Sequence, residues 1–301
     1  MIDVRSPSEF LRGHIPGAQS YPLFTDQERA IVGTLYKQNS PSEALEAGLK
    51  LVADKLPNLI DSLSALPTPL QIYCARGGMR SHAVGHLLTS LKLPCNVIKG
   101  GYKQYRSSVL QTFQKPYKLT IVAGLTGSGK TAYLQKLAEA QEQVLDLEGI
   151  ACHRGSIFGA LEDPQPTQQQ FENEIAEKLN QLSPTRPIFV EDEARTIGAC
   201  TIPESLFLQM QEAPYIELTC SKERRIENLL DQYTHIDAEE IIHCTKLLRK
   251  RLGSQRVEQI IAAVERREFR EAVFHILHHY DKSYEKALSK KNPKKLLKNF
   301  F

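Results

Sequence analysis

The chain has 301 residues, of which 41% are hydrophobic and 24% are charged, which fits a globular protein of one or two domains. No apolar run is long enough to cross a bilayer and no signal peptide is visible, so we expect a cytoplasmic protein without a membrane partner. Because the net charge is only +3, any nucleic-acid binding must be argued from local patches of charge. Six scattered cysteines without a CxxC pair argue against a zinc site and against a disulfide framework.

Strand and helix patterns alternate over the first third of the chain. A strand ending near residues 3–5 precedes a short helix that Pro7 starts and Ser6 or Ser8 caps. Residues 26–63 are predicted to be largely helical, with breaks at 40–41 and 56–57, and further strands are expected at 70–73 and 96–98. This alternation predicts a parallel α/β sheet, whose active site lies at the carboxyl ends of its strands.

Cys74 lies at such a strand end, in a short loop that leads into a helix. The backbone N–H groups of the loop and the positive helix end face the thiol, and Arg76 and Arg80 add positive charge, all of which favours the nucleophilic thiolate. An isolated cysteine is more often a buried core residue, but the two arginines reverse that preference. We predict Cys74, Arg76 and Arg80 as catalytic residues and the rest of the loop as an oxyanion site, namely Gly77, Gly78, Met79 and Ser81.

A second phosphate-binding pattern follows a linker predicted at residues 111–117. The β-branched strand 119–123 enters a complete G-x4-G-K-T phosphate loop, and a helix is expected at 132–141. In such a loop the backbone cradles a diphosphate, the lysine neutralises it and the threonine reaches Mg²⁺. The predicted diphosphate-binding residues are Gly124, Leu125, Thr126, Gly127, Ser128, Gly129, Lys130 and Thr131.

Acidic residues end the next predicted strands, 144–148 and 187–190. Glu148 ends the first, and Glu191, Asp192 and Glu193 follow the second, where a P-loop protein holds Mg²⁺ through water; which of the three acts stays open. A strand at 214–220 leads to a helix capped by Ser221, with a cluster of Lys222, Arg224 and Arg225 that either binds an anion or is merely solvated.

Helices are predicted from residue 237 onward. The lysine-rich tail from residue 281 suits an RNA backbone and equally suits a solvated terminal helix.

The first third of the chain resembles a rhodanese domain. The resemblance is carried by DVRSPSEFLRGHIPGA, the Cys74 loop and IKGGYKQY, over residues 1–106. Rhodanese-like enzymes carry sulfur or selenium on the loop cysteine, whose place Cys74 takes. The Cys-x5-Arg loop is one residue longer than in many sulfurtransferases and also resembles cysteine-dependent phosphatases, so it could admit a phosphate-bearing selenium donor.

The second half resembles the P-loop half of the tRNA 2-selenouridine synthase family, in which a rhodanese half comes first. DLEGIACHRGSIFG, VEDEARTIG and CSKERRIENLL carry that likeness, and residues 27–38 resemble the family's rhodanese insertion, so the match covers nearly the whole chain. Cys152 stands where the family has asparagine. We therefore predict a rhodanese-like α/β domain at 1–110, the linker, and an α/β P-loop domain at 118–301 with a helical, basic C-terminal region.

The resemblance implies conversion of wobble-position 2-thiouridine in tRNA to 2-selenouridine, through S-geranylation with geranyl diphosphate and then exchange with selenophosphate. It implies tRNA and a selenophosphate supply as partners, Mg²⁺ as a weakly bound cofactor, and no haem, flavin, zinc or tightly bound metal. Three alternatives are a rhodanese sulfurtransferase coupled to an ATP-using P-loop kinase, a cysteine phosphatase, and a regulatory binding protein. The predicted magnesium or substrate residues are Glu148, His153, Arg154, Ser156, Glu191, Asp192, Glu193 and Arg195.

Overall fold

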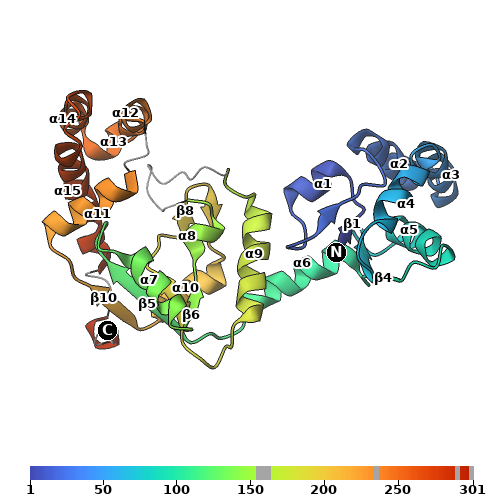
Figure 1. Ribbon diagram of the computed structural model, residues 1–301, viewed down its shortest axis with the longest axis horizontal. Helices are drawn as coiled ribbons and strands as arrows, with labels where there is room; N and C mark the ends of the chain where they lie inside the picture. The colour runs from blue at the N-terminus through green and yellow to red at the C-terminus, as the bar shows by residue number, and fades with distance from the viewer. Residues whose placement is uncertain (154–163, 234–236, 289–291, 298–301) are drawn as a thin grey trace. The chain divides into compact units, whose positions relative to one another are not determined.

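The computed structural model describes residues 1–153, 164–233, 237–288 and 292–297 of the chain (Figure 1). It divides into two compact units. The first unit contains residues 1–113 and 167–177, and the second contains residues 114–166 and 178–301. The chain therefore leaves the first unit after residue 113, returns to it for one short segment, and then completes the second unit.

The first unit is built on a parallel sheet with strand order β2-β1-β3-β4. Its strands are β1 (Ile2–Asp3), β2 (Gln19–Ser20), β3 (Leu70–Tyr73) and β4 (Cys95–Val97). Ile2 pairs with Ile72, and Leu70 pairs with Cys95. Because all pairs are parallel, the predicted sheet type is confirmed and the carboxyl ends of β1 and β3 lie at one edge.

Six helices of the first unit precede residue 113. They are α1 (Pro7–Arg12), α2 (Asp26–Gln38), α3 (Pro41–Val52), α4 (Leu56–Ser64), α5 (Met79–Ser90) and α6 (Gly101–Thr112). Ser6 is the N-cap of α1, as expected, and the predicted breaks separate α2, α3 and α4. Helix α6 continues through residues 111 and 112, where the sequence suggested a linker, because Val109, Thr112 and Phe113 are buried.

The returning segment is the first part of helix α9 (Gln168–Gln181), which the sequence analysis did not predict. Asn173 is fully buried and donates from Nδ2 to the His14 carbonyl and the Tyr102 hydroxyl, each at 2.8 Å. Its Oδ1 accepts from Arg106 at 2.6 Å. Buried polar atoms that are all paired in this way fix one packing geometry, so this segment is an integral part of the first unit.

The second unit has a parallel sheet of order β10-β5-β7-β6. Its strands are β5 (Leu119–Gly124), β6 (Gln143–Leu145), β7 (Ile188–Glu191) and β10 (Tyr215–Leu218). The other elements up to β10 are α7 (Lys130–Glu139), α8 (Leu147–Ile150), α10 (Glu204–Glu212) and the hairpin of β8 (Thr196–Ile197) and β9 (Cys200–Thr201). The fold class is thus the predicted α/β one in both units.

One strand prediction in this unit was too long. Strand β6 ends at Leu145 instead of continuing to Glu148. The Asp146 carboxylate accepts a hydrogen bond from the Gly149 N–H at 2.8 Å, and this cap starts the short helix α8. Glu148 therefore lies on α8, where it is buried.

A helical region completes the second unit, as predicted. It comprises α11 (Lys222–Tyr233), α12 (Ala238–Leu247), α13 (Arg249–Leu252), α14 (Ser254–Glu265), α15 (Phe269–Leu288) and a 3-10 turn (Pro293–Lys295). Ile226, Leu229 and Leu277 form a core between α11 and α15. The Leu297 N–H donates to the Tyr215 carbonyl at 2.8 Å, so the chain covers part of β10. Among the described helices, none has the length and hydropathy that crossing a membrane needs.

Candidate active sites

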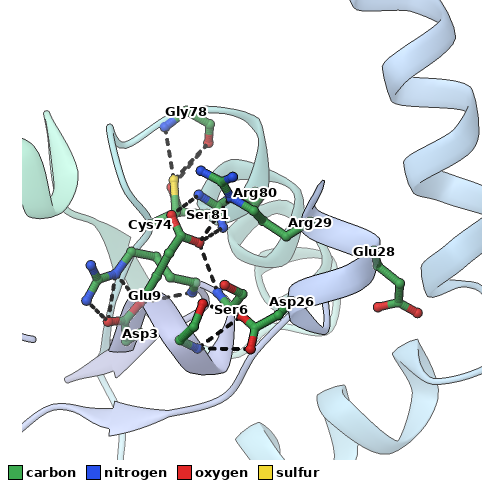
Figure 2. A network of polar contacts seen from close by, with 12 residues as sticks. Asp3, Ser6, Glu9, Asp26, Glu28, Arg29, Cys74, Gly78, Arg80 and Ser81 are labelled. Carbon is green, nitrogen blue, oxygen red and sulfur yellow. Dashed lines mark hydrogen bonds and ion pairs between the residues drawn. The ribbon is translucent and has the colours of Figure 1, made fainter. Parts of the chain in front are cut away.

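The Cys74 loop connects strand β3 to helix α5 in the first unit. Cys74 is 3% exposed, and its Sγ accepts a hydrogen bond from the Gly78 N–H at 3.3 Å (Figure 2). The Ser81 hydroxyl lies 3.2 Å from the same sulfur. The loop thus curls around the thiol, with the Gly78 N–H and the Ser81 hydroxyl next to the sulfur.

These hydrogen bonds determine the protonation of the thiol. Burial by itself raises the pKa of Cys74, but hydrogen bonds from Ser81 and from the backbone N–H groups of Arg76 and Gly78 outweigh it and lower the pKa below its usual value. The thiolate is therefore stabilised by donors that are fixed in the fold.

Two glycines let the loop pass close to the start of α6. Gly77 has φ +61°, and a Cβ there would lie 2.7 Å from the Ile98 carbonyl oxygen. A Cβ on Gly101 would lie 2.2 Å from the Cys74 carbonyl oxygen. The Tyr102 N–H donates to that same oxygen at 2.9 Å, so the IKGGY segment packs directly against the Cys74 loop.

Arg80 forms an ion pair with Glu9, a partner that the sequence analysis did not find. Its Nη1 donates to Glu9 Oε2 at 2.6 Å and its Nη2 donates to Oε1 at 3.2 Å (Figure 2). Burial alone would raise the pKa of Glu9, but the hydrogen bonds and charge of Arg80 lower it to about 2. Glu9 is therefore ionised at neutral pH and cannot serve as the leaving-group acid that a cysteine phosphatase needs. Arg76 is exposed.

The second centre is the phosphate loop between β5 and α7. Lys130 Nζ donates to the Gly124 carbonyl at 3.1 Å and lies 3.6 Å from a Glu191 carboxylate oxygen. The Thr131 hydroxyl donates to the other Glu191 oxygen at 3.4 Å. Glu191, at the end of β7, thus contacts both Lys130 and Thr131, which is the place of the acidic residue in P-loop proteins.

Three buried or half-buried carboxylates meet beside this loop. Oxygen atoms of Glu148, Glu191 and Glu193 all lie within 4.8 Å of one another. Burial and mutual repulsion raise the pKa of Glu148 and of Glu193, and burial raises that of Glu191. Oxygen-only ligands together with the Thr131 hydroxyl fit Mg²⁺, and a bound divalent cation would allow all three acids to ionise.

Two helices of the C-terminal region, α11 and α15, form hydrogen bonds with the phosphate loop. From α11, Arg225 Nε donates to the Thr126 carbonyl at 2.9 Å and Asn228 Nδ2 donates to the Gly127 carbonyl at 2.9 Å. From α15, Asp281 accepts from the Arg225 guanidinium at 2.5 Å. The Tyr284 hydroxyl accepts from the Gly124 N–H at 2.5 Å and lies 3.3 Å from an Asp192 carboxylate oxygen.

The remaining predicted site residues are spread more widely. Asp192 lies 3.3 Å from the Tyr284 hydroxyl, and its charge helps to raise the pKa of Glu193. Arg195 lies 3.9 Å from Glu204. His153 is 9% exposed and burial lowers its pKa. Arg154 and Ser156 lie outside the described residues.

The basic cluster at the start of α11 is satisfied by its own neighbours. Lys222 lies 3.7 Å above the Phe274 ring, Arg224 pairs with Glu227, and Arg225 pairs with Asp281. Because each of these three side chains already has a partner within the chain, no bound anion is needed to explain the cluster.

Comparison with known proteins agrees with this architecture. Residues 1–108 match the model of the rhodanese-like domain, and residues 117–299 match that of the tRNA 2-selenouridine synthase AAA domain. The fold and the two loops thus define a rhodanese-like domain joined to a P-loop domain. The chain belongs to the tRNA 2-selenouridine synthase family, a family of enzymes that act on tRNA.

Individual relatives show the extent of the match. The chain is 36% identical over 244 residues to tRNA 2-selenouridine synthase of Nitrosomonas europaea, covering 77% of this chain and 63% of that protein. It is 37% identical over 294 residues to the enzyme of Salmonella enteritidis, covering 88% and 79%. A crystallised N-terminal domain of an ATP/GTP binding protein from Clostridium difficile 630 is 41% identical, with a TM-score of 0.35 over 36% of this chain and 87% of that one.

Proposed function

We propose that this chain is a cytoplasmic transferase that converts 2-thiouridine at the wobble position of tRNA to 2-selenouridine. One observation supports this function above all: the same chain carries a thiol surrounded by N–H donors and a phosphate loop surrounded by carboxylates. The first suits a selenium-transferring nucleophile that meets an oxyanion, and the second suits a diphosphate leaving group. The names of the relatives supply the tRNA substrate.

The first reaction is S-geranylation at the phosphate loop. The thiocarbonyl sulfur attacks the allylic carbon of geranyl diphosphate, the carbon–oxygen bond breaks, and diphosphate leaves with the electron pair. Lys130 and the N–H groups of residues 124–131 stabilise that leaving group. Glu148, Glu191 and Glu193 would hold Mg²⁺, which supplies further neutralisation of the diphosphate when bound.

The second reaction is selenation at the Cys74 loop. Selenophosphate binds to the loop N–H groups and to Arg76, while Arg80 adds positive charge that Glu9 partly neutralises. Cys74 provides the nucleophile of this half-reaction. In the net exchange a carbon–selenium bond forms at C2 of the base, the carbon–sulfur bond breaks and geranylthiol leaves. Water cleaves the phosphorus–selenium bond of the donor, and phosphate is released.

Mass spectrometry of tRNA nucleosides tests both halves. The protein is incubated with 2-thiouridine-containing tRNA, Mg²⁺ and geranyl diphosphate, with or without selenophosphate. We expect geranylated thiouridine without selenophosphate and selenouridine with it. Cys74→Ala should stop only the second product, and Lys130→Ala should stop the first. Unchanged nucleosides together with ATP consumption would instead establish the sulfur-carrier kinase.

A further inference from the structure

The turn between helices α12 and α14 concentrates unpaired positive charge on the second unit. Residues 241–257 contain five Lys or Arg and no Asp or Glu. Lys246, Arg249 and Lys250 are exposed, and Arg256 is half-buried. We call these four side chains, carried by the end of α12, the short α13 and the start of α14, the basic hairpin.

The basic hairpin differs from three neighbouring arginines of the helical region. Arg225, Arg266 and Arg270 each have an acidic partner, respectively Asp281, Glu268 and Glu227. Within the described part of the chain, no ion pair is formed by any of the four hairpin residues. Although Glu239, Glu240 and Glu258 flank the stretch, no direct ion pair among the described residues neutralises these four charges, which is the arrangement expected for a surface that meets an external polyanion.

A packed core holds these side chains in place. Leu248, Leu252 and Val257 come from the same stretch and are at most 6% exposed. They pack with Ile241 and Ile260 of the flanking helices. The alternation of buried leucines and exposed cations means that the charges are presented by ordered helices.

We propose that the basic hairpin is a docking surface for the sugar–phosphate backbone of the tRNA substrate. The inference rests on the proposed function, since tRNA is the polyanion which that function requires. Charge complementarity favours this occupant: consecutive phosphates offer one negative charge each, and four cations on one turn can meet several of them. Sequence or base recognition is not required of this surface, because backbone contacts position the RNA.

The salt dependence of tRNA binding tests the proposal. The triple variant Arg249→Gln, Lys250→Gln and Arg256→Gln is compared with the unchanged full chain by filter binding of 2-thiouridine-containing tRNA at several salt concentrations. We expect the affinity to fall by about tenfold or more at moderate salt, and the slope of log K against log salt to decrease by about 2. A single charge reversal, Lys250→Glu, should weaken binding in the same direction.

A control of equal net charge separates this surface from general electrostatics. Lys37→Gln, Lys92→Gln and Lys136→Gln remove three exposed lysines at scattered positions. This control should leave the slope nearly unchanged, and circular dichroism should show native helix content in both triple variants. Equal weakening by the scattered control, or no weakening by the hairpin variant and by Lys250→Glu, would overturn the proposal. So would binding of the hairpin to anionic phosphatidylglycerol vesicles with no effect on tRNA.

Nucleoside analysis in the same preparations distinguishes two kinds of failure. If the unchanged chain modifies tRNA and the hairpin variant does so with the same KM for tRNA, the docking surface is wrong while the proposed function holds. If the unchanged chain modifies no nucleoside, the proposed function fails and this inference fails with it. A raised KM with a preserved kcat supports the docking surface.

Discussion

At the scale of single residues, the reactivity of Cys74 depends on donors that the loop supplies. Ser81 lies 3.2 Å from the sulfur and contributes the largest of the effects that lower the thiol pKa. We expect Ser81→Ala to raise the pKa of Cys74, because one hydrogen bond to the thiolate is lost. The midpoint of the pH profile of iodoacetamide alkylation at Cys74 should move upward accordingly. Ser62→Ala, an exposed serine, should leave the midpoint in place; an unmoved midpoint in Ser81→Ala would contradict this account.

Glu9 stabilises the first unit through its contact with Arg80. Its pKa is about 2 in the folded chain against a usual value of 4.5, so its contribution is fully present above pH 4.5 and is lost as the pH falls toward 2. Glu9→Gln leaves a largely buried guanidinium with a weaker partner, and we expect a loss of about 1–3 kcal/mol at neutral pH. Urea unfolding at several pH values measures the effect, and the difference from the unchanged chain should shrink below pH 4.5.

The exposed pair Glu46–Lys50 offers a control for that measurement. Glu46→Gln should not change the unfolding midpoint measurably, because an exposed ion pair gains little. A Glu9→Gln effect that stayed constant down to pH 2.5 would show that packing, and not charge, is responsible.

Sequence alone could predict where the candidate site residues lie when they belong to one continuous loop. Cys74, Lys130 and Thr131 were placed between a strand and a helix because these elements and a glycine-containing turn are neighbours in the chain. Glu9 and Tyr284 were not found as partners of these loops, because they come from positions 71 and 160 residues away and no local pattern marks them. Residue types within a motif are visible in sequence, whereas partners from other elements depend on tertiary packing.

At the scale of elements, helix α15 supports the phosphate loop through one hydroxyl group. The Tyr284 hydroxyl accepts a hydrogen bond from the Gly124 N–H, and it lies beside Asp192 at the end of the neighbouring strand. We expect Tyr284→Phe to weaken binding of inorganic diphosphate by about three- to tenfold, because the loop N–H loses a fixed partner. Titration calorimetry measures this, with the exposed Tyr36→Phe as the matched control. Equal affinities in the two variants would rule out the supporting role.

Helix α9 shows that periodicity can reveal a helix without revealing which unit the helix belongs to. Its buried Phe171, Ile175 and Leu179 recur at helical spacing, so its existence was predictable from periodicity. Its membership in the first unit was not, because that depends on Asn173, a polar residue that is fully buried only through its contacts with His14, Tyr102 and Arg106.

Asn173 therefore makes a specific stability prediction. Asn173→Ala leaves the His14 carbonyl, the Tyr102 hydroxyl and the Arg106 guanidinium each with one partner fewer, and we expect a loss of about 2–4 kcal/mol. Chemical denaturation of the full chain measures it. Gln168→Ala, in the first turn of the same helix at an exposed position, should cost less than about 0.5 kcal/mol. Similar losses for the two variants would mean that helix propensity, and not the buried network, holds this segment.

At the scale of the whole molecule, the first unit is completed by residues that follow the phosphate loop in the chain. A fragment that ends at residue 113 contains the entire match to the rhodanese-like domain but lacks residues 167–177. In that fragment Arg106 loses both Glu172 and Asn173, and Tyr102 loses its hydrogen bond from Asn173. We expect fragment 1–113 to melt several degrees below the same fragment fused through a Gly/Ser linker to residues 164–181. Differential scanning calorimetry compares the two, and a fusion carrying Asn173→Ala should recover only part of the difference. If fragment 1–113 melts at the same temperature as the fusion, the returning segment adds nothing to the first unit, and the two domains are as separable as their sequence motifs suggest.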